Sequence, residues 1–256
     1  MNRQEFNDTL ETVIEEYRNN ISVELKERWN SWNIEINSKE IYEVIGGLLC
    51  RQVILMRHFA IARAAWNSDL APIFHRTQID NFISLSWILL DPLERAKKYI
   101  YHGLGVEKLN INARKEQLKL DGYEDNNDPL IEYSQAWLSS QRYDFLTEVN
   151  FGSWSGISTK KMAEESNNIQ LYNYSYQPFS STSHNMWNHI GKMCMRQSEN
   201  PLHKLLHIPT IVDYEPDLWS LELGAKYLDR SFKCVDNYFP LLSNIKSSYE
   251  ALIKEL

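Results

Sequence analysis

The chain has 256 residues, of which 43% are hydrophobic and 24% are charged, proportions that are ordinary for globular proteins and exclude a largely disordered chain. Its 34 acidic and 27 basic residues give a net charge of −7, which argues against a broad nucleic-acid or anionic-membrane surface but leaves room for a local basic site. Nine glycines and eight prolines are few for this length, so we expect long helices and few loops.

Three cysteines, Cys50, Cys194 and Cys234, lie far apart in the sequence. No two of them have the spacing of a metal site, so we expect reduced thiols in a cytoplasmic protein with no metal or other cofactor. The N-terminal segment is acidic and amphipathic, unlike a signal peptide. No apolar run reaches the roughly 18 residues that suggest a membrane span, so we expect no membrane partner.

Apolar residues recur at helical spacing over residues 3–29 and again over residues 39–66. The next stretch, residues 73–90, is apolar on almost every side of a helix drawn through it. Such a helix is typical of the middle of a bundle, and we expect the other helices to surround it.

Two Asp-Pro pairs predict helix starts, because aspartate can cap a helix and proline fits its first position. The first is Asp91-Pro92, with Glu94 at the spacing of a capping box. The second is Asp128-Pro129, which begins a helix that we expect to end at about Phe145.

The C-terminal part carries a heptad seam after a loop-like segment at residues 150–156 and a connection at residues 196–209. Its apolar residues alternate steps of three and four: Leu218, Leu221, Ala225, Leu228, Phe232, Val235, Phe239 and Leu242. We expect the seam to pack inside its own bundle and to kink at Pro240, with a homodimer through the seam as the alternative.

No stretch alternates in the manner of a strand, so the predicted fold is all-α. We expect a single compact bundle of about eight to ten helices over residues 1–256. In this bundle residues 1–70 form N-terminal helices, residues 72–190 form a core, and residues 210–256 form a C-terminal helix or kinked helix pair.

A polar line crosses the otherwise apolar stretch 73–90, at Arg76, Asp80 and Ser84. Burying an ion pair costs several kcal/mol per charge unless hydrogen bonds compensate. One explanation is a site in which arginine and aspartate hold a phosphate or carboxylate. The other is a pair that fixes the register of the helix.

A second polar line runs at steps of four through Tyr172, Tyr176, Ser180 and His184, with Ser183 beside it. Histidine can act as an acid or base near neutral pH, and tyrosines can stack on a base or hydrogen-bond a phosphate. Alternatively, the tyrosines belong to the core with hydrated hydroxyls and the histidine is an interior group with a hydrogen-bond partner.

Both lines lie on apolar helices and need partners, so we expect residues 172–187 to pack against residues 73–90. This packing would bring Tyr176 and His184 toward Arg76 and Asp80. The predicted site has Arg76, Asp80 and His184 as catalytic residues. Its predicted substrate-binding residues are Tyr172, Tyr176, Ser180, Ser183, Arg95 and Trp154.

Three segments in this order resemble a bacterial family of uncharacterised all-helical proteins: HRTQIDNFISLSWILLDPLERAKKYIYH, then Gly152-Ser153-Trp154, then YNYSYQPFSSTSHNMW. The resemblance covers about residues 72–190. It implies that Arg76 matches the arginine of the family and that Asp80 stands where the family usually has glutamate. It also aligns the second polar line with a tyrosine, serine and histidine block, and it implies no activity.

A looser resemblance is to HEPN domains, helical bundles that often act as metal-independent ribonucleases in defence and toxin systems. Their signature is an arginine and a histidine with four to six residues between them, and three pairs fit it with six residues between: Arg51–His58, Arg95–His102 and Arg196–His203. The pair Arg95–His102 is the best placed, on the helix that follows the central one, whereas Pro201 interrupts the third pair.

These observations leave three functional hypotheses. The first is an enzyme or toxin-like effector that acts on RNA or a nucleotide in a local pocket. The second is a helical module that binds a small anionic ligand or a partner protein without chemistry. The third is a structural protein that interacts through its C-terminal seam.

Overall fold

The computed structural model describes residues 3–123, 128–141, 152–241 and 245–256. These residues are mostly helical, so the all-α prediction is confirmed. The chain divides into two compact units. Unit 1 comprises Met1–Glu35, Ile45–Leu90 and Thr159–Leu256, and unit 2 comprises Ile36–Val44 and Asp91–Ser158.

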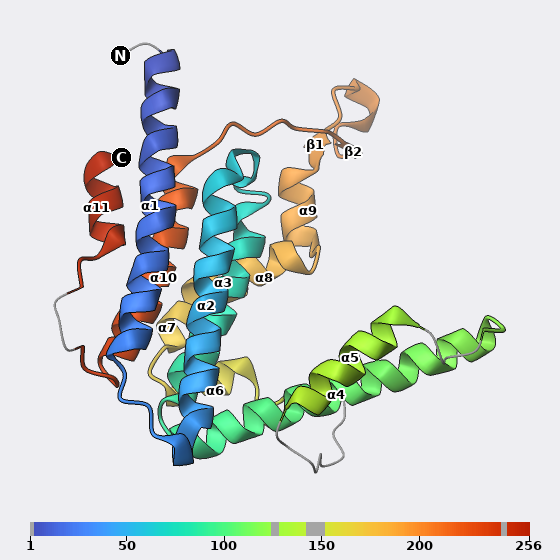
Figure 1. Cartoon of the computed structure of the whole chain (residues 1–256). Coiled ribbons are helices and arrows are strands. Elements are labelled where there is room, and N and C mark those ends of the chain that lie inside the picture. Colours follow the sequence, from blue (N-terminus) through green and yellow to red (C-terminus); the bar gives the residue numbers. More distant parts are fainter. Residues whose placement is uncertain (1–2, 124–127, 142–151, 242–244) are drawn as a thin grey trace. The chain divides into compact units, whose positions relative to one another are not determined.

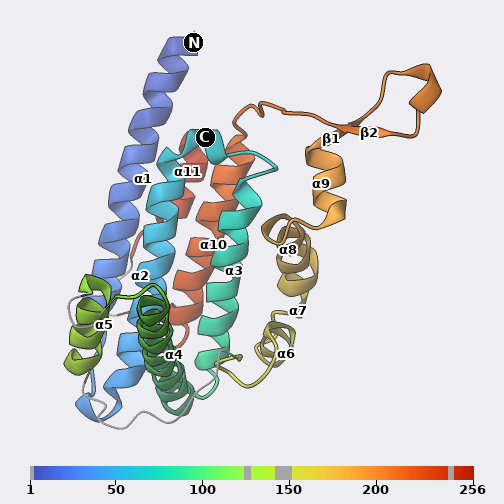
Figure 2. The ribbon, with the colours of Figure 1, turned by 90° about the vertical axis from the view of Figure 1, so that its right-hand side faces the viewer.

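Four long helices lie side by side in unit 1 (Figures 1 and 2): α1 (Arg3–Ser31), α2 (Lys39–Ile61, from Ile45 on), α3 (Ala71–Ile88) and α10 (Leu218–Asp236). Their apolar faces form one core, with fully buried side chains that include Ile45, Leu49, Met56, Ile79, Ile83, Leu221 and Phe232. Buried amides add polar links between α2 and α3, since Gln52 Nε2 donates to the Gln78 carbonyl at 2.8 Å.

The heptad seam lies within unit 1, and most of its residues are buried on α10. Helix α10 ends at Asp236 and the last helix, α11, spans Ser248–Glu255. The helix therefore stops before Pro240 instead of kinking through it, because residues that precede a proline disfavour the helical conformation. Leu242, the last seam residue, lies outside the described residues, and a homodimer through the seam stays a prediction.

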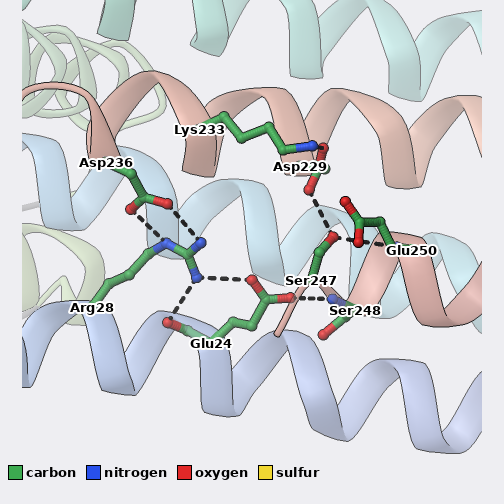
Figure 3. Close-up of polar contacts among 8 residues, drawn as sticks. All are labelled: Glu24, Arg28, Asp229, Lys233, Asp236, Ser247, Ser248 and Glu250. Atoms are coloured by element: carbon green, nitrogen blue, oxygen red, sulfur yellow. Dashed lines mark hydrogen bonds and ion pairs between the residues drawn. The ribbon is translucent and has the colours of Figure 1, made fainter. Parts of the chain in front are cut away.

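A buried charged cluster joins α1, α10 and α11 (Figure 3). The Arg28 guanidinium donates to both carboxylate oxygens of Asp236 at 2.9 Å and to Glu24 Oε2 at 2.8 Å. The other Glu24 oxygen accepts from the Ser248 backbone N–H at 2.6 Å, and the guanidinium lies over the Phe232 ring. Each buried charge thus has a partner, which is what makes burial of charge tolerable.

Helix α1 also comes close to α2, where a glycine makes room for an aromatic ring. A Cβ atom at Gly46 would lie 2.6 Å from the Trp29 ring. Any side chain there would therefore displace the tryptophan, and the lack of one permits the close contact of the two helices.

Short elements follow α3 on the far side from α2 (Figure 2). They are α6 (Thr159–Glu165), α7 (Ile169–Leu171), a π-helical turn (Tyr172–Tyr176), α8 (Gln177–Ser183) and α9 (Trp187–Met193). Strands β1 (Met195–Gln197) and β2 (His207–Pro209) then pair antiparallel around η5 (Pro201–His203). Residues 196–209, predicted as a connection, thus connect α9 to α10 and contain a short hairpin that the sequence analysis did not predict. The remaining 3₁₀ segment of this unit, η2, spans Arg63–Ala65.

Unit 2 contains η1 (Ile36–Ser38), α4 (Pro92–Leu120) and α5 (Pro129–Ser140), and α4 and α5 share a small apolar cluster. Asp128 caps α5 as predicted, since its side chain accepts from two backbone N–H groups. Asp91 precedes α4, but its side chain accepts no capping hydrogen bond. Its backbone angles (φ −150°, ψ 74°) differ from those with which Asp128 caps α5 (φ −80°, ψ 116°). The predicted helix end at Phe145 and the loop residue Asn150 lie outside the described residues.

Among the described residues, the segment Ile36–Ile61 is long and apolar enough to cross a membrane. Half of its most apolar window is buried inside the structure, and core helices of soluble proteins pass the same test. The absence of a membrane partner and a cytoplasmic location stay predictions.

Candidate functional site

Arg76 of α3 is held by side chains that follow α7, as the two polar lines predict. Its Nε donates to Ser180 Oγ at 2.8 Å, and its Nη2 donates to the Tyr176 hydroxyl. The guanidinium carbon lies 3.3 Å from the centroid of the Tyr176 ring. Hydrogen bonds and a cation–π contact therefore fix the orientation of the guanidinium plane.

Asp80 lies one helical turn after Arg76, and its carboxylate is 3.4 Å from Arg76 Nη1. The Asp80 side chain is 47% exposed, whereas that of Arg76 is 15% exposed. The guanidinium of Arg76 is thus largely buried, whereas the carboxylate of Asp80 is in contact with solvent. An ion pair of this kind contributes about 1 kcal/mol or less to stability.

Two tyrosines are stacked beside the guanidinium because the chain forms a π-helical turn at this point. Pro178 has no backbone N–H for the α-helical bond to Tyr174, and Tyr172–Tyr176 forms the wider turn just before it. The rings of Tyr172 and Tyr176 lie 4.7 Å apart and nearly parallel. Burial raises the pKa of the Tyr176 hydroxyl, so this phenol stays protonated near neutral pH and is not a base there.

His184 does not join this cluster. Helix α8 ends at Ser183, and Asn185 adopts a left-handed conformation with φ 52°. The N–H groups of Asn185 and Met186 turn back to the carbonyls of Thr182 and Ser181, the pattern of a Schellman cap. His184 still follows the step of four, since its backbone N–H donates to the Ser180 carbonyl, but it is the C-cap of α8 and its side chain is exposed. The predicted approach of His184 to Arg76 is wrong for this reason.

The remaining predicted residues lie elsewhere. Ser183 lies on α8 and donates to the Phe179 carbonyl at 3.4 Å, a local contact that leads away from Arg76. Arg95 and Trp154 belong to unit 2. There the Trp154 ring meets the Tyr99 ring edge to face, with centroids 4.8 Å apart. The predicted site residues are thus divided between the two units.

A second polar cluster in unit 1 was missed by the sequence analysis. His189 Nε2 lies 2.8 Å from Asp69 Oδ1, and His189 Nδ1 lies 3.1 Å from the Thr182 hydroxyl. Asp69 precedes α3 and His189 follows α8, 120 positions away. No local spacing signals such a contact. It ties α9 to the start of α3.

The Arg76 cluster offers binding groups rather than a proton-transfer pair. Arg76 has N–H groups beyond those used by Ser180, Tyr176 and Asp80, and no partner for them is found among the described residues. No histidine contacts the cluster in that part of the chain. A search of the described ranges also finds no group of three or more histidine, cysteine, aspartate or glutamate residues suited to a metal ion.

A family model described as a family of unknown function, DUF5677, matches residues 42–201, which is more than half of the chain. The chain belongs to the DUF5677 family. The predicted membership of an uncharacterised domain family is therefore confirmed. The DUF5677 match includes α3, the π-helical turn and α8, so it contains the whole Arg76 cluster. No match to a curated protein or to a solved structure was found, and the resemblance to HEPN domains stays a prediction.

Proposed function

We propose that this DUF5677 protein is a non-catalytic helical module that binds a small anionic ligand with a flat ring, such as a nucleotide, at the Arg76 cluster. The observation that carries this proposal is the fixed guanidinium of Arg76, set beside stacked tyrosines and held by Tyr176 and Ser180. A planar fork of donors matches phosphate and carboxylate oxygens, and an aromatic stack suits a flat ring.

The arrangement favours binding over catalysis because it lacks a group that titrates near neutral pH. His184 lies outside the cluster, and burial raises the pKa of Tyr176. Asp80 remains as an exposed carboxylate beside the guanidinium. In the bound state we expect the ligand anion to compete with Asp80 for Arg76 Nη1, so Asp80 would disfavour anions that cannot displace it.

Isothermal titration calorimetry with AMP, adenosine and inorganic phosphate tests the proposal. We expect AMP to bind more tightly than either fragment, and we expect Arg76→Lys to weaken AMP binding at least about tenfold, since lysine lacks the planar fork. Arg230→Lys is the matched control, because Arg230 is also an arginine over an aromatic ring in unit 1. No binding of any probe by the unmodified protein, or equal binding by Arg76→Lys, would contradict the proposal.

A second candidate function, a metal-independent ribonuclease of a defence or toxin system, is favoured by one face of α4 in unit 2. Arg95, Tyr99 and His102 follow each other at steps of four and three on this helix. The His102 ring Nε2 lies 3.1 Å from the Gly152 carbonyl. In this reading His102 Nδ1 would take the proton of a ribose hydroxyl while Arg95 holds the phosphate.

Incubation of the protein with total RNA tests the second candidate. Cleavage that His102→Ala abolishes would support it. His58→Ala is the matched control, because Arg51 and His58 have the same spacing on α2 and are both exposed. Intact RNA after incubation, or equal loss of cleavage in both variants, would count against a ribonuclease on α4.

A further inference from the structure

The paired strands and their loop, residues 195–212, form an arm that extends away from the long helices of unit 1 (Figure 2). Its large apolar side chains cover little of one another. Leu205 is 91% exposed and Ile211 is 97% exposed, and Leu202, Leu206 and Val212 are also exposed. Single exposed apolar residues are common, but a group of five on one short segment marks an interaction surface.

The base of this arm is anchored, so the exposure is a feature of a held segment. His189 of α9 contacts Asp69 at 2.8 Å. On the returning side, the Tyr214 hydroxyl donates to the Met193 carbonyl at 2.9 Å. Polar contacts therefore hold the base of the arm, while its apolar tip contributes no buried core.

The two edges of the arm differ. The bonds from Ser198 N to the Leu206 carbonyl and from Thr210 N to the Cys194 carbonyl define which backbone groups face inward. By alternation, the backbone groups of Met195 and Gln197 face outward from β1. No hydrogen bond of these groups is found among the described residues.

On β2 the outward positions are His207 and Pro209. Proline has no N–H to donate, and natural proteins use it to protect sheet edges from pairing. The arm thus has one open edge, β1, and one protected edge, β2.

We propose that β1 pairs antiparallel with β1 of a second copy of this chain, so that two arms form a four-stranded sheet in a homodimer. A single open edge favours a closed pair over an open-ended fibre, since the protected edge stops further addition. In this pairing a two-fold axis relates the two copies and passes between their Gln197 residues. Arg196 then lies opposite Ser198 of the second copy, which keeps the two Arg196 guanidiniums apart.

The surface of the arm suits a partner of its own kind. A standard interface takes roughly 800 Å² from each partner. Leu202, Leu205 and Ile211 are almost wholly exposed, so their burial would contribute part of that area. The arm carries two basic residues, Arg196 and Lys204, and one acidic residue, Glu199. It is close to neutral in a chain of charge −7, so two arms repel each other little.

Sedimentation velocity over 1–100 µM tests the proposed dimer. We expect the unmodified protein to dimerise in this range, and we expect Leu205→Asp with Ile211→Asp to be monomeric with an unchanged circular dichroism spectrum. Leu120→Asp is the control, because Leu120 is equally exposed on α4 and its replacement should leave the dimer intact. A monomeric unmodified protein, or a dimer that persists in the double variant, would overturn the proposal.

Disulfide trapping tests the strand pairing itself. In a Cys194→Ser background, Gln197→Cys should form an intermolecular disulfide under mild oxidation, because the two residues meet at the axis. His207 lies on the protected edge and is exposed like Gln197. His207→Cys is therefore the control and should not cross-link. Equal cross-linking of both variants, or of neither, would overturn pairing through β1.

Discussion

Two arginines of unit 1, Arg28 and Arg76, lie in similar chemical surroundings but differ in what surrounds their carboxylate partners. Each has an aromatic ring under its guanidinium, Phe232 at 4.1 Å and Tyr176 at 3.3 Å. Arg28 is bonded to two carboxylates and is 5% exposed (Figure 3). Arg76 is bonded to neutral hydroxyls, and its one carboxylate is half in water.

This difference separates a structural cluster from a candidate binding site. In the Arg28 cluster two carboxylates share a guanidinium that is 5% exposed, and they depend on this cation for their burial. In the Arg76 cluster the Asp80 carboxylate is 47% exposed, so water can take its place. Burial of the partner carboxylate, more than the presence of an arginine–aspartate pair, therefore indicates which role a pair has.

The largest expected effect is the loss of Arg28. Arg28→Met keeps an apolar stem of similar length but strands Glu24 without its cation, so we expect the free energy of unfolding to fall by about 3–5 kcal/mol. Urea denaturation measures this change. Lys161→Met is the control in unit 1, because its partner Glu164 is 41% exposed and the pair should contribute about 1 kcal/mol or less. Equal losses in the two variants would contradict the expected difference between ion pairs with a buried carboxylate and ion pairs with an exposed one.

A smaller effect is expected from His75, which neighbours Arg76 in sequence but faces the core. Burial lowers the pKa of His75 to about 4, and the ring is 1% exposed. The unfolded chain takes up a proton near pH 6.5, whereas the folded state resists it until about pH 4. The contribution of His75 to the free energy of unfolding is therefore fully present above pH 6.5 and is lost as the pH falls. At pH 5 this contribution is about 2 kcal/mol smaller than at pH 7.

Urea denaturation at pH 7 and pH 5 checks the contribution of His75. His75→Gln should show a smaller loss of stability between the two pH values than the unmodified protein. His184→Gln should match the unmodified protein, because His184 is exposed. An unchanged pH dependence in His75→Gln would mean that other groups cause the acid sensitivity.

The smallest expected effect is that of Asp80. Asp80→Asn removes a half-exposed charge and should change the free energy of unfolding by less than about 0.5 kcal/mol. In the calorimetric titration with AMP the same variant should bind more tightly, since a carboxylate that competes with the ligand anion is gone. A large loss of stability would instead mean that the Asp80 pair is structural, like the pairs of Arg28.

The helices and one half of the candidate site were predictable from sequence because their signals are local. Apolar spacing predicted α3, and a polar line on each of two apolar segments predicted that Arg76 meets Tyr176 and Ser180. The exposure of His184 was not predictable from a step of four, because this residue is the C-cap of α8, directly before the left-handed Asn185 that ends the helix. The contact of Asp69 with His189 spans 120 positions, and no periodicity carries information over that distance.

The cluster around Arg28 also has a consequence for biosynthesis. Its bonds join residues 208 and 224 positions apart in the chain. At a synthesis rate of roughly 5–20 residues per second, Asp236 follows Arg28 out of the ribosome only after roughly 10–40 s. Throughout that interval α1 carries an apolar face without its α10 and α11 neighbours, and its Arg28–Glu24 pair lacks Asp236 and Ser248. The nascent chain therefore offers chaperones a long-lived binding segment, and closure of unit 1 awaits the arrival of α10 and α11.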